Sequence, residues 1–163
     1  MKISVFSDYI CPFCYIGTET LRKIRPEVPS FTLEWKGFQI HPEYPAAGIP
    51  TDRRIAQYGQ ERYATIWRNI LSLAEGIGLK MSPPSVLTNS LMALEATEYA
   101  KEQGKEEVFS RSVYQAYFQE GKNIGDIEVI LSLAEQAGLK LHEVHGCPVS
   151  FYFFDFVNLF GVK

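Results

Sequence analysis

The 163-residue chain has the length of one compact domain, and its hydrophobic fraction of 46% is ordinary for a globular protein. Its charged residues make up 21% and leave a net charge of −3, which argues against a nucleic-acid-binding surface. One segment does gather basic side chains, at a mixed spacing typical of a solvated helix face: Arg53, Arg54, Arg62 and Arg68.

The first forty residues predict a βαβ unit. Residues 2–6 and residues 31–36 alternate polar and apolar side chains, as short strands do. Between them we expect a helix that begins at Pro12 behind a capping Cys11 and ends before Pro26. Two strands joined by a helix imply parallel pairing, with the cysteines placed where the first strand passes into its helix.

Prolines and a glycine mark an irregular connection over residues 39–50, and the hydrophobic period then changes to about 3.6, which predicts helices. Thr88 or Asn89 is expected to cap one of these helices, and Asp126 another. Two longer helices carry apolar stripes that should be buried in the core, since helix packing alone explains them. The stripes comprise Tyr63, Ile66, Trp67, Ile70, Leu71 and Ala74, and Val108, Phe109, Val113, Ala116 and Tyr117.

No stretch of the sequence suggests a leader peptide or a membrane span. Asp8 interrupts the N-terminus early, and the apolar residues 148–162 are fewer than the roughly 20 needed to cross a bilayer. We therefore expect a cytoplasmic protein with no membrane partner. Because the cytosol keeps ordinary thiols reduced, the close pair among the three cysteines needs a chemical explanation.

Cys11 and Cys14 are separated by two residues at the expected start of a helix, a spacing that lets two sulfurs bridge. The unpaired amides and the positive end of the helix dipole should lower the pKa of Cys11 below its free value of about 8.5. A Cys11 thiolate would attack a disulfide, and Cys14 would resolve the mixed disulfide. We expect Tyr9, Pro12 and Phe13 to line the substrate groove.

Zinc binding is the rival interpretation of the same cysteines. Cys11 and Cys14 are able to form a four-ligand site with two of His142, His145 and Cys147, a donor set that structural zinc sites use. Such a protein would be a non-enzymatic binding domain, because both thiolates would be occupied. The redox interpretation requires no metal and no bound cofactor. His41 fits a loop residue better than a ligand or a base.

The sequence resembles the DsbA-like family of thioredoxin-fold proteins, in particular its cytoplasmic FrnE-like branch of dithiol-disulfide isomerases. The resemblance rests on residues 7–17 around the CPFC motif, on residues 37–42, on residues 89–90 with 93–96, and on residues 116–126. It implies an α/β thioredoxin-like fold with an all-helical insertion and exchange with protein or small-molecule thiols and disulfides. The family also includes 2-hydroxychromene-2-carboxylate isomerases and kappa-class glutathione transferases, so a glutathione-dependent isomerase or transferase, with glutathione as co-substrate, is an alternative.

The resemblance divides the chain into an N-terminal thioredoxin-like half at residues 1–48, a helical insertion at 49–140 and a C-terminal strand region at 141–163. The cis-proline that the family places opposite its cysteine pair would be Pro148. Compared with the family, the C-terminal part is shortened or divergent. An incomplete sheet exposes a strand edge that seeks another chain, so we also expect a homo-oligomer.

Overall fold

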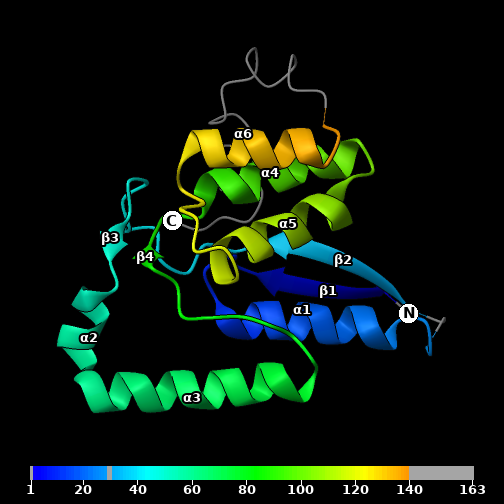
Figure 1. Cartoon of the computed structure of the whole chain (residues 1–163). Helices are drawn as coiled ribbons and strands as arrows, with labels where there is room; N and C mark the ends of the chain where they lie inside the picture. The colour runs from blue at the N-terminus through cyan, green and yellow to red at the C-terminus, as the bar shows by residue number, and fades with distance from the viewer. Residues whose placement is uncertain (1, 29–30, 140–163) are drawn as a thin grey trace, which may run out of the picture.

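A computed structural model describes residues 2–28 and 31–139 of the chain (Figure 1). A parallel pair of strands and its connecting helix come first, and helices make up most of the rest. In chain order the elements are β1 Lys2–Ser7, α1 Pro12–Ile24, β2 Thr32–Gly37, β3 Ile49–Pro50, α2 Asp52–Tyr58, α3 Gln60–Gly76, β4 Val86–Leu87, α4 Leu91–Glu102, α5 Glu106–Phe118 and α6 Ile127–Gln136.

The predicted βαβ unit is confirmed. β1 and β2 pair in parallel, from Lys2 opposite Thr32 to Ser7 opposite Gly37, and each strand begins and ends within one residue of its prediction. Figure 1 shows both strands pointing toward the same edge, where α1 begins. The loops that follow β1 and β2 therefore lie next to each other, an arrangement that places ligand sites at the carboxyl ends of parallel strands.

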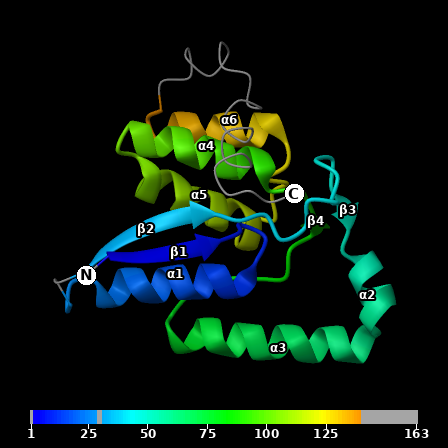
Figure 2. The same cartoon turned by 180° about the vertical axis from the view of Figure 1, so that it is seen from behind.

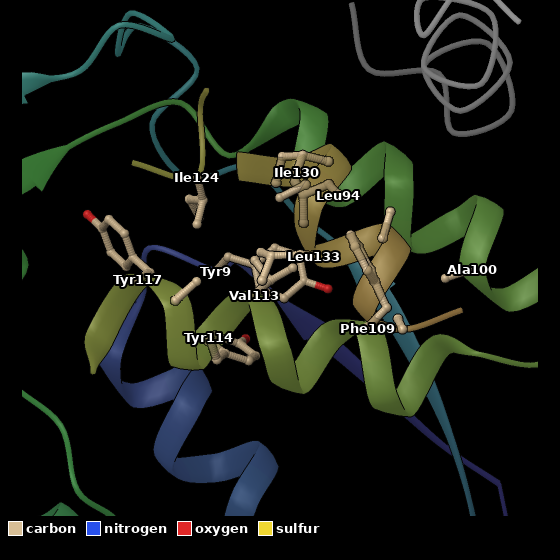
Figure 3. Packing of buried hydrophobic residues seen from close by; sticks show 14 of the residues in the cluster. Tyr9, Leu94, Ala100, Phe109, Val113, Tyr114, Tyr117, Ile124, Ile130 and Leu133 are labelled. Carbon is tan, nitrogen blue, oxygen red and sulfur yellow. The ribbon is translucent and has the colours of Figure 1, made fainter. Parts of the chain in front are cut away.

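The helices α4, α5 and α6 form a block beyond β2, whereas α1 and α3 lie on the β1 side of the molecule, as Figures 1 and 2 agree. The core lies between α4, α5, α6 and the first loop (Figure 3). Phe109, Val113 and Tyr114 of α5 are fully buried there. Tyr9 of the β1–α1 loop enters the same core, so the cysteine loop is fixed by the helical block.

Aromatic rings continue this core toward α1. Tyr9 stacks on Trp35 at 5.3 Å between ring centroids and meets the edge of Tyr114 at 4.8 Å. Tyr15 of α1 stacks on the other side of Tyr114 at 4.8 Å and on Phe118 at 5.7 Å. Because such contacts add to the burial of each ring, this run of rings holds α1 in a fixed position against α5.

Three details of the helical region differ from the prediction. It is not all-helical, because β3 and β4, which precede and follow α2 and α3 in the chain, form a short antiparallel ladder. The helical segment between these two strands is broken at Gly59, whose φ of 82° separates α2 from α3. The cap of α4 is Ser90, although the neighbouring Asn89 does accept a hydrogen bond from the Leu91 amide.

The burial expected of the two apolar stripes is only partly correct. In α3, Ile70 and Ala74 are buried, but Ile66 is exposed and Trp67 is half-buried. In α5, the exposed fraction of Val108 is 58%, whereas its neighbour Phe109 is fully buried. Helical period identifies a face, but the neighbouring elements decide how much of that face is covered.

Asp126 caps α6 as predicted, with its carboxylate accepting the amide of Glu128 at 3.0 Å. Within the part of the chain that the structure describes, no helix has the length and apolar character to cross a membrane. The predicted C-terminal strand region and Pro148 lie outside the described residues. The boundaries predicted for the insertion remain a prediction.

Candidate active site

The cysteine pair occupies the first turn of α1. β1 ends at Ser7, and Cys11 is the N-cap of α1, with an extended backbone at φ −92° and ψ 114°. Pro12 takes the first helical position, where its missing N–H costs no hydrogen bond. The Cys11 amide donates to the Asp8 carbonyl at 3.2 Å, and the Cys11 carbonyl accepts from Tyr15. The predicted helix start, with Cys11 as the cap and Pro12 in the first position, is confirmed.

Both cysteines are free thiols and both are partly exposed to solvent. Their side chains lie close enough for the thiol of one cysteine to donate toward the sulfur of the other. The amides of Phe13 and Cys14 face the Cys11 sulfur without closing a capping hydrogen bond. This arrangement is that of a reduced dithiol within bridging reach.

When the cysteine pair loses its first proton, the negative charge lies on Cys14. The hydrogen bond from the Cys11 thiol, followed by the Asp8 amide and the Ser7 hydroxyl, outweighs burial and lowers the pKa of Cys14 to about 6. The same shared hydrogen bond raises the pKa of Cys11. The expectation that Cys11 has the lowered pKa is therefore wrong for the reduced pair, because Cys14 has the better set of donors.

Ser7 and Tyr114 extend this set of donors into the core. The Ser7 and Tyr114 hydroxyl oxygens lie 2.5 Å apart, and Tyr114 also lies 3.3 Å from the Asp8 carbonyl oxygen. Burial raises the pKa of Tyr114, so its hydroxyl keeps its proton at neutral pH. When Tyr114 donates to Ser7, the single Ser7 proton is left for the Cys14 sulfur. Tyr114 thus orients Ser7, and Ser7 stabilises the thiolate.

The carboxyl group of Asp8 joins the two loops at the carboxyl end of the sheet. It is almost fully buried, and its oxygens accept the amide of Ile10 at 3.2 Å and that of Ile40 at 2.7 Å. The Ser90 hydroxyl faces the same carboxyl group but falls short of a good hydrogen bond. Burial raises the pKa of Asp8 in spite of these donors. Asp8 therefore fixes the cysteine loop to the loop after β2.

Replacement of Asp8 by alanine should destabilise the reduced protein by about 2–4 kcal/mol, because the amides of Ile10 and Ile40 lose their acceptors. Urea unfolding at neutral pH measures this difference in free energy. The control is Asp52→Ala, which removes an exposed carboxylate from the first turn of α2 and should cost about 1 kcal/mol or less. Equal losses in the two variants would contradict the role of Asp8.

The three residues expected to line the groove have different positions. Phe13 is exposed to 58% beside the cysteines, and Pro12 is partly exposed, so both are accessible to a substrate. Tyr9 is fully buried, and its hydroxyl lies 2.5 Å from that of Thr97. The prediction for Tyr9 is wrong, because the packing of its ring against Trp35 and Tyr114 leaves no surface for a ligand.

Sequence reasoning missed Ser7 and Tyr114 as contributors to the site. Ser7 opens the segment 7–17 on which the resemblance rests, and its place as the last residue of β1 indicates a side chain next to the helix start. Tyr114 lies 107 residues after Ser7 in the chain, and no local sequence pattern connects the two residues. Pro148 and the histidines of the proposed zinc site lie outside the described residues. Within 2–28 and 31–139, no group of three or more metal-binding side chains comes together.

A strand–helix–strand unit with a dithiol at the helix start defines a thioredoxin-fold protein with a candidate redox site. The family of DSBA-like thioredoxin domains matches residues 2–148 of the chain. The chain therefore belongs to the DsbA-like thioredoxin family, and its fold is the DsbA-like thioredoxin fold.

Three known proteins illustrate the similarity. The chain is 33% identical to the uncharacterized protein YwbO of Bacillus subtilis (strain 168), over 85% of this chain and 67% of that protein. Its fold is similar to that of the probable DsbA oxidoreductase SCO1869 from Streptomyces coelicolor, with a TM-score of 0.80 and 24% identity over 90% of this chain and 66% of the other. A 2-hydroxychromene-2-carboxylate isomerase gives a TM-score of 0.70 at 16% identity, over 90% of this chain and 70% of that one. The chain thus spans about two thirds of the length of these proteins.

Proposed function

We propose that the protein is a thiol-disulfide oxidoreductase or isomerase that works through Cys11 and Cys14. The observation that supports this function best is the pair of free, partly exposed thiols that lie beside each other at the start of α1. Membership of the DsbA-like family supports the same class of reaction. No bound cofactor is required, since the two sulfurs carry both electrons.

The proposed reaction begins with transfer of a proton from Cys11 to Cys14, which leaves a thiolate at the N-cap, where amides of the first turn face it. The Cys11 thiolate attacks one sulfur of the substrate disulfide, the substrate S–S bond breaks, and the first substrate group leaves as a thiolate that takes the proton from Cys14. The Cys14 thiolate then attacks Cys11 in the mixed disulfide and releases the second substrate group, which takes up a proton from solvent. The protein dithiol is oxidised as the substrate disulfide is reduced, and the reverse sequence forms a substrate disulfide.

Replacement of Cys11 by serine should abolish activity in an insulin-reduction assay with dithiothreitol as electron donor, because serine does not form a mixed disulfide. Replacement of Cys14 by serine should instead trap the mixed disulfide on Cys11, which mass spectrometry of the intact protein detects. The control is Ser112→Ala on α5, whose hydroxyl donates to the Phe109 carbonyl of its own helix. Undiminished turnover in Cys11→Ser would reject the proposal.

A glutathione-dependent isomerase or transferase is the second candidate. The fold similarity to the 2-hydroxychromene-2-carboxylate isomerase favours it. In that reaction glutathione would be a co-substrate bound near Cys11, and Cys14 would be dispensable. Retention of activity in Cys14→Ser, together with a requirement for glutathione, would select this function over disulfide exchange.

The remaining sequence predictions stay predictions. A zinc-binding domain would contain stoichiometric metal after purification, which elemental analysis measures. We place the exchange activity in the cytoplasm, with thiol and disulfide partners and no nucleic acid. We also expect self-association. Within the described residues β1 and β2 pair only with each other, and an unpaired strand edge tends to pair with another chain.

A further inference from the structure

A hollow of about 280 Å³ lies between the end of α1, the two parallel strands and the start of α5. Its apolar lining consists of Leu21 from α1 and of Val5, Leu33 and Trp35 from the strands. Its charged lining consists of Arg22, Arg25, Lys101, Glu106 and Glu107. Ligand pockets combine an apolar wall with a few polar groups in this way, and the volume suits a small molecule.

This hollow is separate from the cysteine pair. Arg22 lies near the C-terminal end of α1, whereas Cys11 caps the first turn. At a rise of about 1.5 Å per residue, the two residues are roughly 16 Å apart along the helix axis. The strand residues Val5 and Trp35 pair in the middle of the sheet, away from the carboxyl ends that lead into the cysteine loop. A small molecule in the hollow would therefore occupy a second site.

The two arginines at the end of α1 hold a carboxylate loosely. The Glu107 carboxylate lies 3.9 Å from Arg22 Nε and 3.4 Å from Arg25 Nη1. Both distances exceed the roughly 2.7–2.9 Å of a good charge-assisted hydrogen bond, and 63% of the Glu107 side chain is exposed. Arg22 is itself held in place by Glu19 and by the Ser110 hydroxyl at 2.9 Å. The arginines are thus oriented around a carboxylate position that Glu107 fills poorly.

The neighbouring Glu106 is a carboxylate that lacks a close cation. It is half-buried in the first turn of α5 and forms no hydrogen bond or ion pair with the part of the chain that the structure describes. Burial raises the pKa of Glu106, although the charge of Lys101 acts against this shift. The Lys101 ammonium instead donates to the Trp35 carbonyl at 2.6 Å and to Glu98 at 2.7 Å. A cation from a ligand would compensate the desolvation of Glu106.

A zwitterion fits these two features together. Its carboxylate would replace that of Glu107 between Arg22 and Arg25, and its ammonium would pair with Glu106. Because Glu106 and Glu107 are adjacent in the chain, the two charged groups of the ligand must also be close to each other, as they are in an α-amino acid. The displaced Glu107 would turn to solvent at little cost, since exposed ion pairs contribute little to stability.

We propose that this hollow binds a free α-amino acid with an aliphatic side chain. The carboxylate of the amino acid binds Arg22 and Arg25, the ammonium binds Glu106, and the side chain is buried against the apolar lining. A peptide is a poorer fit, because either of its ends carries only one of the two charged groups. The thiols take no part in this binding, so the proposal does not depend on the proposed function.

Titration calorimetry of the full chain with L-leucine tests the proposal. N-acetyl-L-leucine lacks the ammonium and L-leucinamide lacks the carboxylate, so each should bind about tenfold more weakly than L-leucine, or worse. Glu106→Gln should weaken leucine binding by a similar factor, and Arg25→Gln should weaken it severalfold. Glu107→Gln should instead tighten leucine binding about twofold or more, because the competing carboxylate is removed.

The matched control is Glu120→Gln, an exposed glutamate beyond the other end of α5, which should leave the affinity unchanged. Fluorescence gives a second measurement, because the chain has two tryptophans and Trp67 of α3 lies outside the lining of the hollow. In Trp67→Phe, leucine should change the emission of Trp35 with the affinity found by calorimetry.

Three results would each overturn the proposal: no leucine binding to the wild type, equal affinities for leucine and either derivative, or undiminished affinity in Glu106→Gln. Cys11→Ser should bind leucine as the wild type does. Failure of the redox function and failure of this site are therefore observed separately.

Discussion

Alkylation of the reduced protein by iodoacetamide should begin at Cys14 and should follow a titration with a midpoint of about pH 6. Iodoacetamide reacts with thiolates, so its rate rises as the thiol ionises and levels off above the pKa. The Cys11 thiol raises the population of the Cys14 thiolate by donating to it. At neutral pH we therefore expect most Cys14 to react as a thiolate and Cys11, whose pKa is raised, to react slowly. Tandem mass spectrometry assigns the label to each cysteine and separates it from Cys147.

Replacement of Cys11 by alanine should move the Cys14 midpoint upward toward the ordinary value of a free thiol, since the largest cause of the lowered pKa is removed and burial acts in the opposite direction. Near pH 7 this shift reduces the Cys14 alkylation rate by roughly one to two orders of magnitude, because a shift of one unit changes the thiolate fraction about tenfold. Ser112→Ala is again the control. A Cys14 midpoint that stays at 6 without Cys11 would show that backbone and Ser7 donors alone hold the thiolate.

Local signals account for the part of the fold that the sequence predicted well. Period-two alternation and a proline at the helix start identify β1, α1 and β2, because these features depend on residues within one element. The parallel pairing follows from the βαβ order, since a helix between two strands brings them side by side. The CPFC motif lies where these elements meet, so the position of Cys11 and Cys14 was predictable for the same reason.

The contributions of distant residues were not predictable in this way. Tyr9 has the polar hydroxyl expected of a groove residue. Its ring nevertheless packs in the core against Trp35 and Tyr114, and its hydroxyl lies next to that of Thr97. The lowered pKa falls on Cys14 rather than Cys11 because Ser7 and the Asp8 amide reach the inner sulfur. Spacing alone identifies a dithiol, but the surrounding donors decide which sulfur carries the charge.

The arginine-rich segment also shows that the spacing of side chains does not predict their surroundings. The mixed spacing of Arg53, Arg54 and Arg62 predicts a solvated face, and Arg53 fits that description. Arg54 does not, because its guanidinium donates to Tyr44 and His41 of a loop that precedes α2 and is anchored by Asn89. Its environment depends on the path of this loop, which has no periodic pattern to predict it.

Replacement of Phe109 by alanine should lower the free energy of unfolding by about 3–5 kcal/mol, because a fully buried ring is removed from the cluster that joins α4, α5 and α6. The control Val108→Ala changes the adjacent residue, which is 58% exposed, and should alter stability by about 0.5 kcal/mol or less. Urea unfolding of both variants measures the difference.

The sequence stripe gives these two neighbours the same role, whereas the structure separates them, so similar losses would contradict the packing shown in Figure 3. The result also bears on the chemistry. Tyr114 lies on the same helix as Phe109 and reaches the cysteine pair through Ser7. Loosening of α5 should therefore raise the Cys14 alkylation midpoint in Phe109→Ala and leave it unchanged in Val108→Ala, which connects the stability of the helical block to the ionisation of the thiol.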